Sequence, residues 1–283
     1  MPHPRVRTTK LLTRMPRMNR SLPVMDQRGF GETLRRDKWW IANIFVVTVL
    51  SSFLAYATWA ALQNAFYTHG PYLSPFYSPE LFGASPHAWF GPKPSWWPGF
   101  IPFSPALIIL PVPALFRFTC YYYRGAYYKA FWADPPACSV GEPRKTYLGE
   151  NSFPLIMQNV HRYALFFSFI FLIFLWHDAY LALWFTDANG VERFGVGVGT
   201  IVMFANVSML SGYTLGCHSM RHLVGGLLDR LSTSPVRKLA YDCSSACNRG
   251  HMNWAWVSLF GVALTDVYIR LCAMGVLTDL RII

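Results

Sequence analysis

Long apolar runs without charge constrain this chain more than any other feature. The first of them, residues 41–66, contains no Asp, Glu, Lys or Arg. A helix of roughly 20 apolar residues is long enough to cross the hydrocarbon core of a bilayer. In the whole chain only 14% of residues are charged, whereas an average soluble domain carries about 25%. Because so few charges cannot cover a water-facing surface, the sequence predicts an integral membrane protein.

Five such runs predict an all-α bundle of five transmembrane helices. The expected spans are residues 41–66, 101–122, 155–185, 194–222 and 252–280. Three prolines, at positions 105, 111 and 113, should kink the second span, because proline lacks the N–H group that a helix needs. We see no internal repeat of the kind that many transporters contain, which counts against a transporter or channel.

The distribution of basic residues predicts the orientation of the bundle. Ten of the 25 Lys and Arg residues precede Trp39, and four more follow the fourth span. Since cytoplasmic segments of membrane proteins carry an excess of Lys and Arg, we expect a cytoplasmic N-terminal arm over residues 1–38, a cytoplasmic Cys/His loop over residues 223–251, and the C-terminus outside. A basic arm can also bind nucleic acid, but no other segment resembles a nucleic-acid module, so no nucleic-acid partner is expected.

Cysteine and histidine residues gather between positions 217 and 251. The patterns are Cys217-His218-x-x-x-His222 and Cys243-x-x-x-Cys247-x-x-x-His251. A spacing of four places side chains on one face of a helix. Two imidazoles and two thiolates at one point are typical of zinc or of a Rieske-type [2Fe–2S] centre. Buried Cys also occur as small hydrophobic residues, but the expected reducing cytoplasmic side favours metal ligands over disulfides.

Haem b is a second interpretation of the same histidines. His161, near the cytoplasmic start of the third span, could hold one haem together with His218 or His222. Two haems are excluded, because the first, second and fifth spans contain no internal His. A structural zinc site in a membrane scaffold is a third interpretation, and it needs no redox partner.

Three segments of the chain resemble a known family. They are Arg35-Arg36-Asp37-Lys38-Trp39-Trp40, Asn159-Val160-His161-Arg162-Tyr163, and Cys217-His218 with Cys243 and Cys247. Together with five spans they resemble the membrane anchor of actinobacterial succinate dehydrogenases, the mycobacterial enzymes above all. The resemblance implies a multi-pass protein of the bacterial cell membrane that holds a flavoprotein and an iron–sulfur subunit and passes their electrons to quinone. The succinate-oxidising site would lie on another chain, and a higher oligomer of the complex is compatible with this role.

The placement of His and Cys differs from that in the haem-containing anchors, and this difference favours a Rieske-type [2Fe–2S] cluster. The expected ligands are His218 and His222 on one iron and Cys243 and Cys247 on the other. The alternative ligands are His251, Cys217 and His161.

A quinone requires hydrogen-bond donors for its carbonyls and an aromatic slot. Four candidate residues lie close in sequence to the expected cluster, and three more are expected at the same depth. They are Arg221, Tyr241, Asp242 and Trp254, then Arg162, Trp39 and Trp40. The alternative interpretation is that the Arg and Trp residues are interfacial anchors in contact with lipid.

Overall fold

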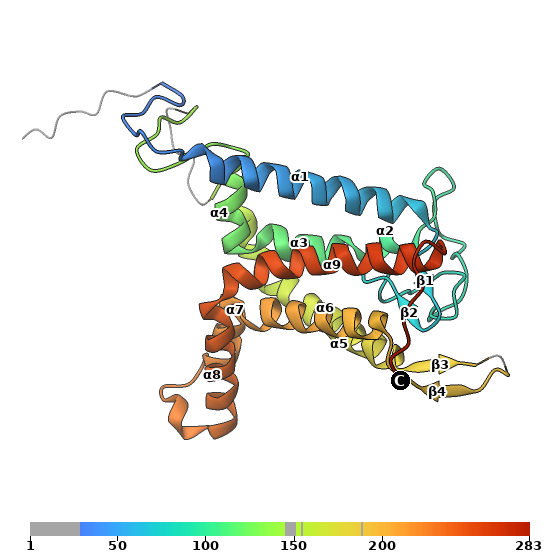
Figure 1. Cartoon of the computed structure of the whole chain (residues 1–283). Helices are drawn as coiled ribbons and strands as arrows, with labels where there is room; N and C mark the ends of the chain where they lie inside the picture. The colour runs from blue at the N-terminus through green and yellow to red at the C-terminus, as the bar shows by residue number, and fades with distance from the viewer. Residues whose placement is uncertain (1–28, 145–150, 154, 188) are drawn as a thin grey trace, which may run out of the picture.

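A computed structural model describes residues 29–144, 151–153, 155–187 and 189–283. Within these residues, four helices are long and apolar enough to cross a membrane, and a bent pair of helices raises the number to five. The four long segments are α1 (Trp40–Gln63), η1 with α5 (Leu155–Val160 and His161–Leu181), α6 (Val198–Leu215) and α9 (His251–Ala273). They run alongside one another as a bundle (Figure 1). The predicted all-α membrane fold is therefore confirmed.

The second expected span is broken twice. It consists of α2 (Pro105–Ile109) and α3 (Pro111–Thr119), followed by α4 (Tyr121–Ala130), which turns away by 78°. The first break coincides with Pro111 and Pro113, which cannot donate a backbone hydrogen bond. The larger bend lies at Cys120, where the backbone is extended (φ −62°, ψ 131°) and no proline is present. The helix expected over residues 101–122 therefore ends at Thr119.

The fourth expected span is also shorter than predicted. Helix α6 ends at Leu215, and Cys217 is extended (φ −64°, ψ 140°) before α7 (His218–Gly225) begins. A short turn, η2 (Leu231–Thr233), leads into α8 (Pro235–Arg249), so most of the segment expected to be a loop is helical. Helices α7 and α8 project from one end of the bundle, across its axis (Figure 1).

Close packing holds α8 against the end of α6. Ser244 donates its hydroxyl to the carbonyl of Leu215 at 2.7 Å, and the Asn248 amide donates to the carbonyl of Gly216 at 2.7 Å. A Cβ at Gly216 would lie 2.9 Å from the carbonyl carbon of Cys247. Only glycine allows this approach, which brings the start of α7 to the end of the bundle.

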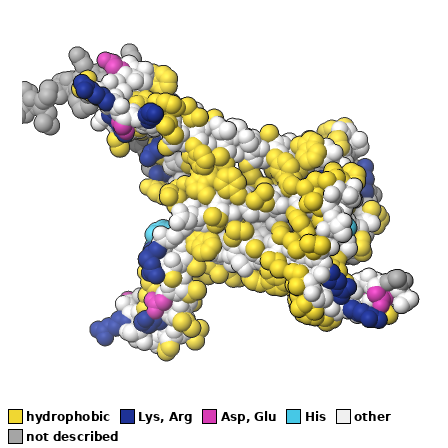
Figure 2. Space-filling view, in the orientation of Figure 1, with side chains coloured by type: hydrophobic (Ala, Val, Ile, Leu, Met, Phe, Trp, Pro, Cys, Tyr) yellow, Lys and Arg dark blue, Asp and Glu magenta, His cyan; other side chains and the backbone are white. Residues whose placement is uncertain are grey.

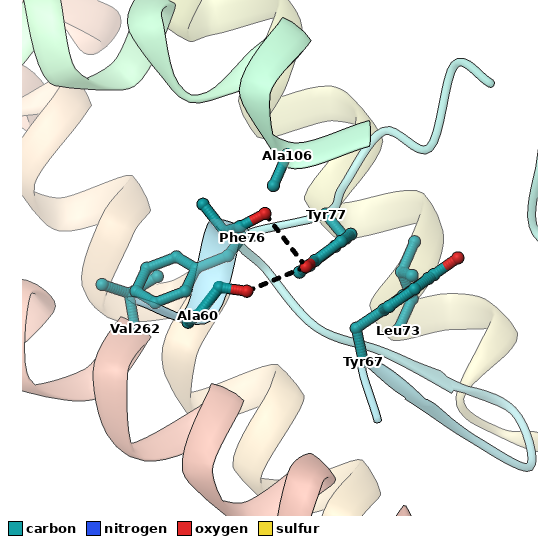
Figure 3. Packing of buried hydrophobic residues seen from close by; sticks show 8 residues of the cluster. Ala60, Tyr67, Leu73, Phe76, Tyr77, Ala106 and Val262 are labelled. Atoms are coloured by element: carbon teal, nitrogen blue, oxygen red, sulfur yellow. Dashed lines mark hydrogen bonds between the residues drawn. The ribbon is translucent and has the colours of Figure 1, made fainter. Parts of the chain in front are cut away.

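The opposite end of the bundle is closed by the segment after α1. It contains the hairpin β1 (Thr68–His69) and β2 (Tyr72–Leu73), and a second hairpin, β3 (Trp184–Thr186) and β4 (Glu192–Phe194), lies beside it. The ring of Tyr77 is fully buried in the bundle and its hydroxyl donates to the carbonyl of Ala60 at 2.8 Å (Figure 3). This aromatic segment is thus a packed part of the core.

The surface of the bundle suits a lipid environment. Hydrophobic side chains cover its flank, and Lys and Arg side chains gather toward its ends (Figure 2). Large apolar side chains on the outer helices are exposed, among them Leu54 at 67%, Phe166 at 65% and Ile173 at 60%. In water such a surface would be costly, whereas in a bilayer these side chains meet lipid.

Candidate functional site

The structure brings the expected ligands together as pairs. His218 and His222 lie one turn apart on α7, with 3.0 Å between their Nε2 atoms, and both are on the surface side of the helix. Cys243 and Cys247 lie one turn apart on α8, and both are free thiols. Burial lowers the pKa of His218, and the neighbouring His222 and Arg221 lower it further. Among the residues that the structure describes, however, no three His, Cys, Asp or Glu side chains are arranged to hold a metal ion.

A second set of Cys and His residues lies inside the bundle, where three of the four are buried and His251 is partly exposed. His161 Nε2 is 2.9 Å from the sulfur of Cys217, and His251 Nε2 is 3.6 Å from the sulfur of Cys120. Cys120 and Cys217 are each 2% exposed and His161 is 7% exposed. We call these four side chains the inner Cys/His cluster. It contains the three alternative ligands and one further residue, Cys120, which belongs to neither sequence pattern.

All four members of the inner Cys/His cluster lie at the ends of helices. Cys120 lies at the bend between α3 and α4, His161 begins α5, Cys217 precedes α7, and His251 begins α9. The two breaks that shortened the expected spans therefore place the two cysteines at the same depth as the two histidines. Four separate elements contribute one side chain each, which periodicity within one helix could not predict.

Aromatic rings line this cluster. Phe116 stacks on His161 with 4.8 Å between ring centroids, and Tyr213 stacks on His251 at 5.0 Å. Phe116 and Tyr213 contact each other edge to face at 5.4 Å. The second nitrogen of His161 lies 2.9 Å from the hydroxyl of Thr119, which fixes the ring. Such a shell shields Cys120, His161 and Cys217 from water, whereas His251 is partly exposed.

One polar group of the cluster lacks the partner that burial normally requires. The Nδ1 atom of His251 is buried and has no hydrogen-bond partner among the described residues. Unsatisfied buried donors and acceptors are rare in proteins and call for a specific explanation.

Arg117 places a positive charge beside the cluster. Its guanidinium donates to the hydroxyls of Tyr123 at 2.8 Å and Ser258 at 2.9 Å, and to the carbonyl of Ala255 at 3.2 Å. It also lies 4.7 Å above the ring of Tyr213. These partners are all neutral, so the positive charge favours any negative charge that forms nearby. An ionisable residue at this depth in a membrane usually marks a functional site.

A cavity of about 370 Å³ lies next to this cluster, between α1, α2, α3, α5, α6 and α9. Its lining is mainly apolar, and it shares Phe116, Arg117 and Tyr213 with the surroundings of the inner Cys/His cluster. The polar side chains in its lining are Thr58, Ser78, Arg117, Ser168, Tyr213 and Thr214. The hydroxyl of Ser168 is buried and has no hydrogen-bond partner among the described residues. An apolar cavity with a few polar groups is typical of a site for a small amphipathic molecule.

The residues expected to bind quinone do not line this cavity. Arg221 donates to the hydroxyl of Tyr241 at 2.8 Å and so links α7 to α8. Asp242 forms a surface ion pair with Lys238, and Trp254 packs on the face of Gly212. Arg162 and Trp40 are exposed and Trp39 is partly exposed. The single Arg inside the second apolar run, at position 117, was the sequence feature that could have identified the cavity.

The family model for the actinobacterial succinate dehydrogenase subunit SdhC matches residues 41–275. The chain belongs to this family. A solved structure titled "Mycobacterium smegmatis Sdh1 complex in the apo form" contains a chain with 41% identity and a TM-score of 0.81. The match covers 92% of this chain and 97% of that one. No curated protein matches the sequence.

Membership of the SdhC family confirms the resemblance that the sequence indicated. The SdhC-family chain is a multi-pass membrane subunit of a succinate dehydrogenase, and it works as part of an enzyme complex. The family does not support the interpretation as a transporter or as a non-redox scaffold.

Proposed function

We propose that this SdhC-family chain accepts electrons from an iron–sulfur subunit docked at the α7–α8 end of the bundle and passes them to a quinone bound in the cavity. The observation that supports this proposal is that the cavity and the inner Cys/His cluster have two aromatic residues in common. Phe116 and Tyr213 contact the inner Cys/His cluster and also line the cavity. An electron carrier at the cluster would therefore lie directly beside the substrate. Succinate is oxidised on a partner flavoprotein subunit.

We propose a [2Fe–2S] cluster of Rieske type as that carrier, with Cys120, His161, Cys217 and His251 as its ligands. Two imidazoles and two thiolates are the donor set of such a centre, and the orphaned His251 nitrogen fits metal binding, although the described side chains are not arranged around one metal position. Each contact joins one His to one Cys, whereas a Rieske centre has both His on one iron. When bound, the centre supplies a one-electron carrier with a potential of roughly −150 to +300 mV.

The inner Cys/His cluster is a better candidate than the set His218, His222, Cys243 and Cys247. The outer set lies on α7 and α8, where Cys243 and the His pair are exposed. Three members of the inner set are buried and all four lie among aromatic rings, and a low-dielectric surrounding controls the potential of a metal centre. Haem b has less support, because His161 directs its nitrogens to Thr119 and Cys217 while His218 and His222 contact each other.

The docking surface for the partner subunits is proposed at the same end of the bundle. Residues 29–38 are joined to residues 132–144 by hydrogen bonds from Thr33 to the carbonyl of Ser139 at 2.8 Å and from Arg35 to that of Cys138 at 3.0 Å. Residues 1–28 of the expected arm lie outside the described residues. With α7 and α8, this joined segment offers a basic surface near the proposed electron carrier.

Electron nuclear double resonance on the purified, reduced complex tests the proposed cofactor. We expect couplings from two histidine nitrogens bound to iron, in addition to the signals of clusters in the partner subunit. This measurement separates the proposed centre from all-cysteine clusters, which contain no nitrogen ligand. Only sulfur-ligated iron together with haem absorption would support haem b instead, and zinc as the only metal of this chain would support a structural site.

The orientation of the bundle gives a separate prediction. A reporter fused within residues 227–240 should lie in the cytoplasm, and one fused after Ile283 should lie outside, because Lys and Arg concentrate at the α7–α8 end. Paired fusions to an enzyme active only in the cytoplasm and one active only outside would measure both positions. A cytoplasmic C-terminus would reverse the orientation and place the docking surface on the wrong side for a succinate-oxidising partner.

A further inference from the structure

Two buried aspartates lie in the half of the bundle that is remote from the inner Cys/His cluster. Asp266 is 0% exposed and forms an ion pair with Arg270, so its charge is compensated. Asp178 is 5% exposed, and no Lys or Arg forms an ion pair with it among the described residues. Its carboxylate accepts a hydrogen bond from the hydroxyl of Ser78 and lies 3.6 Å from Nδ1 of His177. A carboxylate at this depth without a permanent cation usually has a function.

The two contacts of Asp178 point in opposite directions. Ser78 lines the cavity, so the carboxylate is one hydroxyl away from the proposed quinone site. The side chain of His177 is 45% exposed and packs beside Trp89, 5.7 Å between ring centroids. His177, Asp178 and Ser78 therefore lie in a row from the surface to the cavity, with a hydrogen bond between Asp178 and Ser78 and a gap of 3.6 Å between Asp178 and His177. Within the cavity, the unpartnered hydroxyl of Ser168 offers a further polar group.

We propose that His177, Asp178 and Ser78 form a proton entry route that serves the cavity from the membrane face opposite the docking surface. The inference rests on the proposed function, because it assigns a proton source to the same quinone. Reduction of a quinone consumes two electrons and two protons, and each carbonyl oxygen becomes a hydroxyl. The electrons come from succinate through the partner subunits. Each proton passes from the His177 imidazolium to the Asp178 carboxylate, and then through the Ser78 hydroxyl, which accepts one proton and releases its own toward the cavity.

Asp279, at the same end of the bundle as Asp178, has only structural contacts. Asp279 accepts hydrogen bonds from the hydroxyls of Tyr72 at 2.7 Å and Tyr268 at 2.6 Å, and from the backbone N–H of Gly199 at 2.9 Å. It connects the β1–β2 hairpin to α6 and α9, and neither it nor these partners line the cavity. Asp279 is therefore a matched control for Asp178.

The route has an electrical consequence. If electrons enter the cavity from the docking side and protons enter from the other side, each turnover moves charge across the membrane. The side of proton uptake can be measured independently of the rate. The test uses the whole complex in proteoliposomes, with a pH indicator trapped in the lumen and succinate added outside, so that only complexes with the α7–α8 end outward are driven. The acceptor is a quinone with a short side chain in the lipid.

We expect the lumen to become alkaline during turnover of the wild-type complex and not after addition of a proton carrier. Asp178→Asn should lower the rate of quinone reduction by about 100-fold, the scale of a lost proton donor, and should remove the luminal signal. Succinate oxidation with a soluble dye should continue. Asp279→Asn should retain both the rate and the luminal signal if it assembles. Ser78→Ala is a second variant of the route and should also lower the rate.

Proton uptake only from the outer solution by the wild-type complex would overturn the route, whatever the variants do. A wild-type rate and signal in Asp178→Asn would overturn it as well. Failure of the proposed function looks different, because the wild-type complex would then oxidise succinate with the dye and reduce no quinone at all.

Discussion

The double variant His161→Ala/His251→Ala is expected to lose succinate-dependent quinone reduction and about two iron atoms per complex, the content of one [2Fe–2S] centre. Both side chains belong to the inner Cys/His cluster, and each has its Nε2 atom within 3.6 Å of a cysteine sulfur. Oxidation of succinate with a soluble dye should persist, because that reaction needs only the partner subunits. Iron analysis and the two activity assays on the purified complex measure all three quantities.

The matched control is His218→Ala/His222→Ala, which removes the exposed pair on α7. We expect this variant to keep its iron and its quinone reductase activity. The reverse outcome, in which the α7 variant loses iron and the inner variant keeps it, would assign the ligands to His218, His222, Cys243 and Cys247. If both variants keep full activity, this chain contains no His-ligated centre.

A third variant tests the reduction potential of the centre separately from its iron content. In His161→Cys/His251→Cys the ligands remain four in number, so iron can be retained. All-cysteine [2Fe–2S] centres have potentials near roughly −400 mV, whereas His ligands raise the range to roughly −150 to +300 mV. Succinate would then reduce the centre poorly, and quinone reduction should fall although iron is present. Potentiometric titration of the reduced signal measures this shift.

The sequence predicted the features that lipid imposes on each segment separately. An uncharged run of this length, such as residues 41–66, is expected to be helical in a bilayer, and α1 covers it up to Gln63. Spacing within one helix also predicted the contact between His218 and His222. Both predictions need only local information.

The inner Cys/His cluster required information that the sequence pattern lacks. Its members lie at helix ends, and the extended backbone at Cys120 and Cys217 has no proline that would identify the breaks. Because the fourth span was expected to continue to His222, the sequence placed Cys217 inside a helix, whereas it lies just before the start of one. The cavity depends on how side chains of six helices pack, so the sequence could only indicate Arg117 as a charge in an apolar run and could not show the cavity beside it.

The variant Asp266→Ala is expected to cause the largest loss of stability in this chain. Arg270 donates to the Asp266 carboxylate at 2.7 Å, and these residues are 3% and 0% exposed. The same carboxylate accepts the hydroxyl of Tyr56 at 2.5 Å and that of Ser74, while Arg270 reaches the carbonyl of Ala60 at 3.0 Å. The pair therefore connects α9 to α1 and to the segment that closes the bundle.

Removal of one partner leaves the other charge buried without compensation, which costs about 3–5 kcal/mol. The exposed pair Lys238 and Asp242, at 54% and 56% exposure, is the control, because an exposed pair contributes only about 0–1 kcal/mol. Asp242→Ala should thus leave the thermal midpoint of the complex almost unchanged, and Asp266→Ala should lower it strongly or prevent assembly. The double variant Asp266→Leu/Arg270→Met should recover part of the loss, since replacement of a whole buried pair by apolar residues is often neutral. If Asp266→Ala unfolds at the wild-type temperature, the ion pair does not hold the closing segment to the bundle, and Tyr77 with its aromatic neighbours must do so alone.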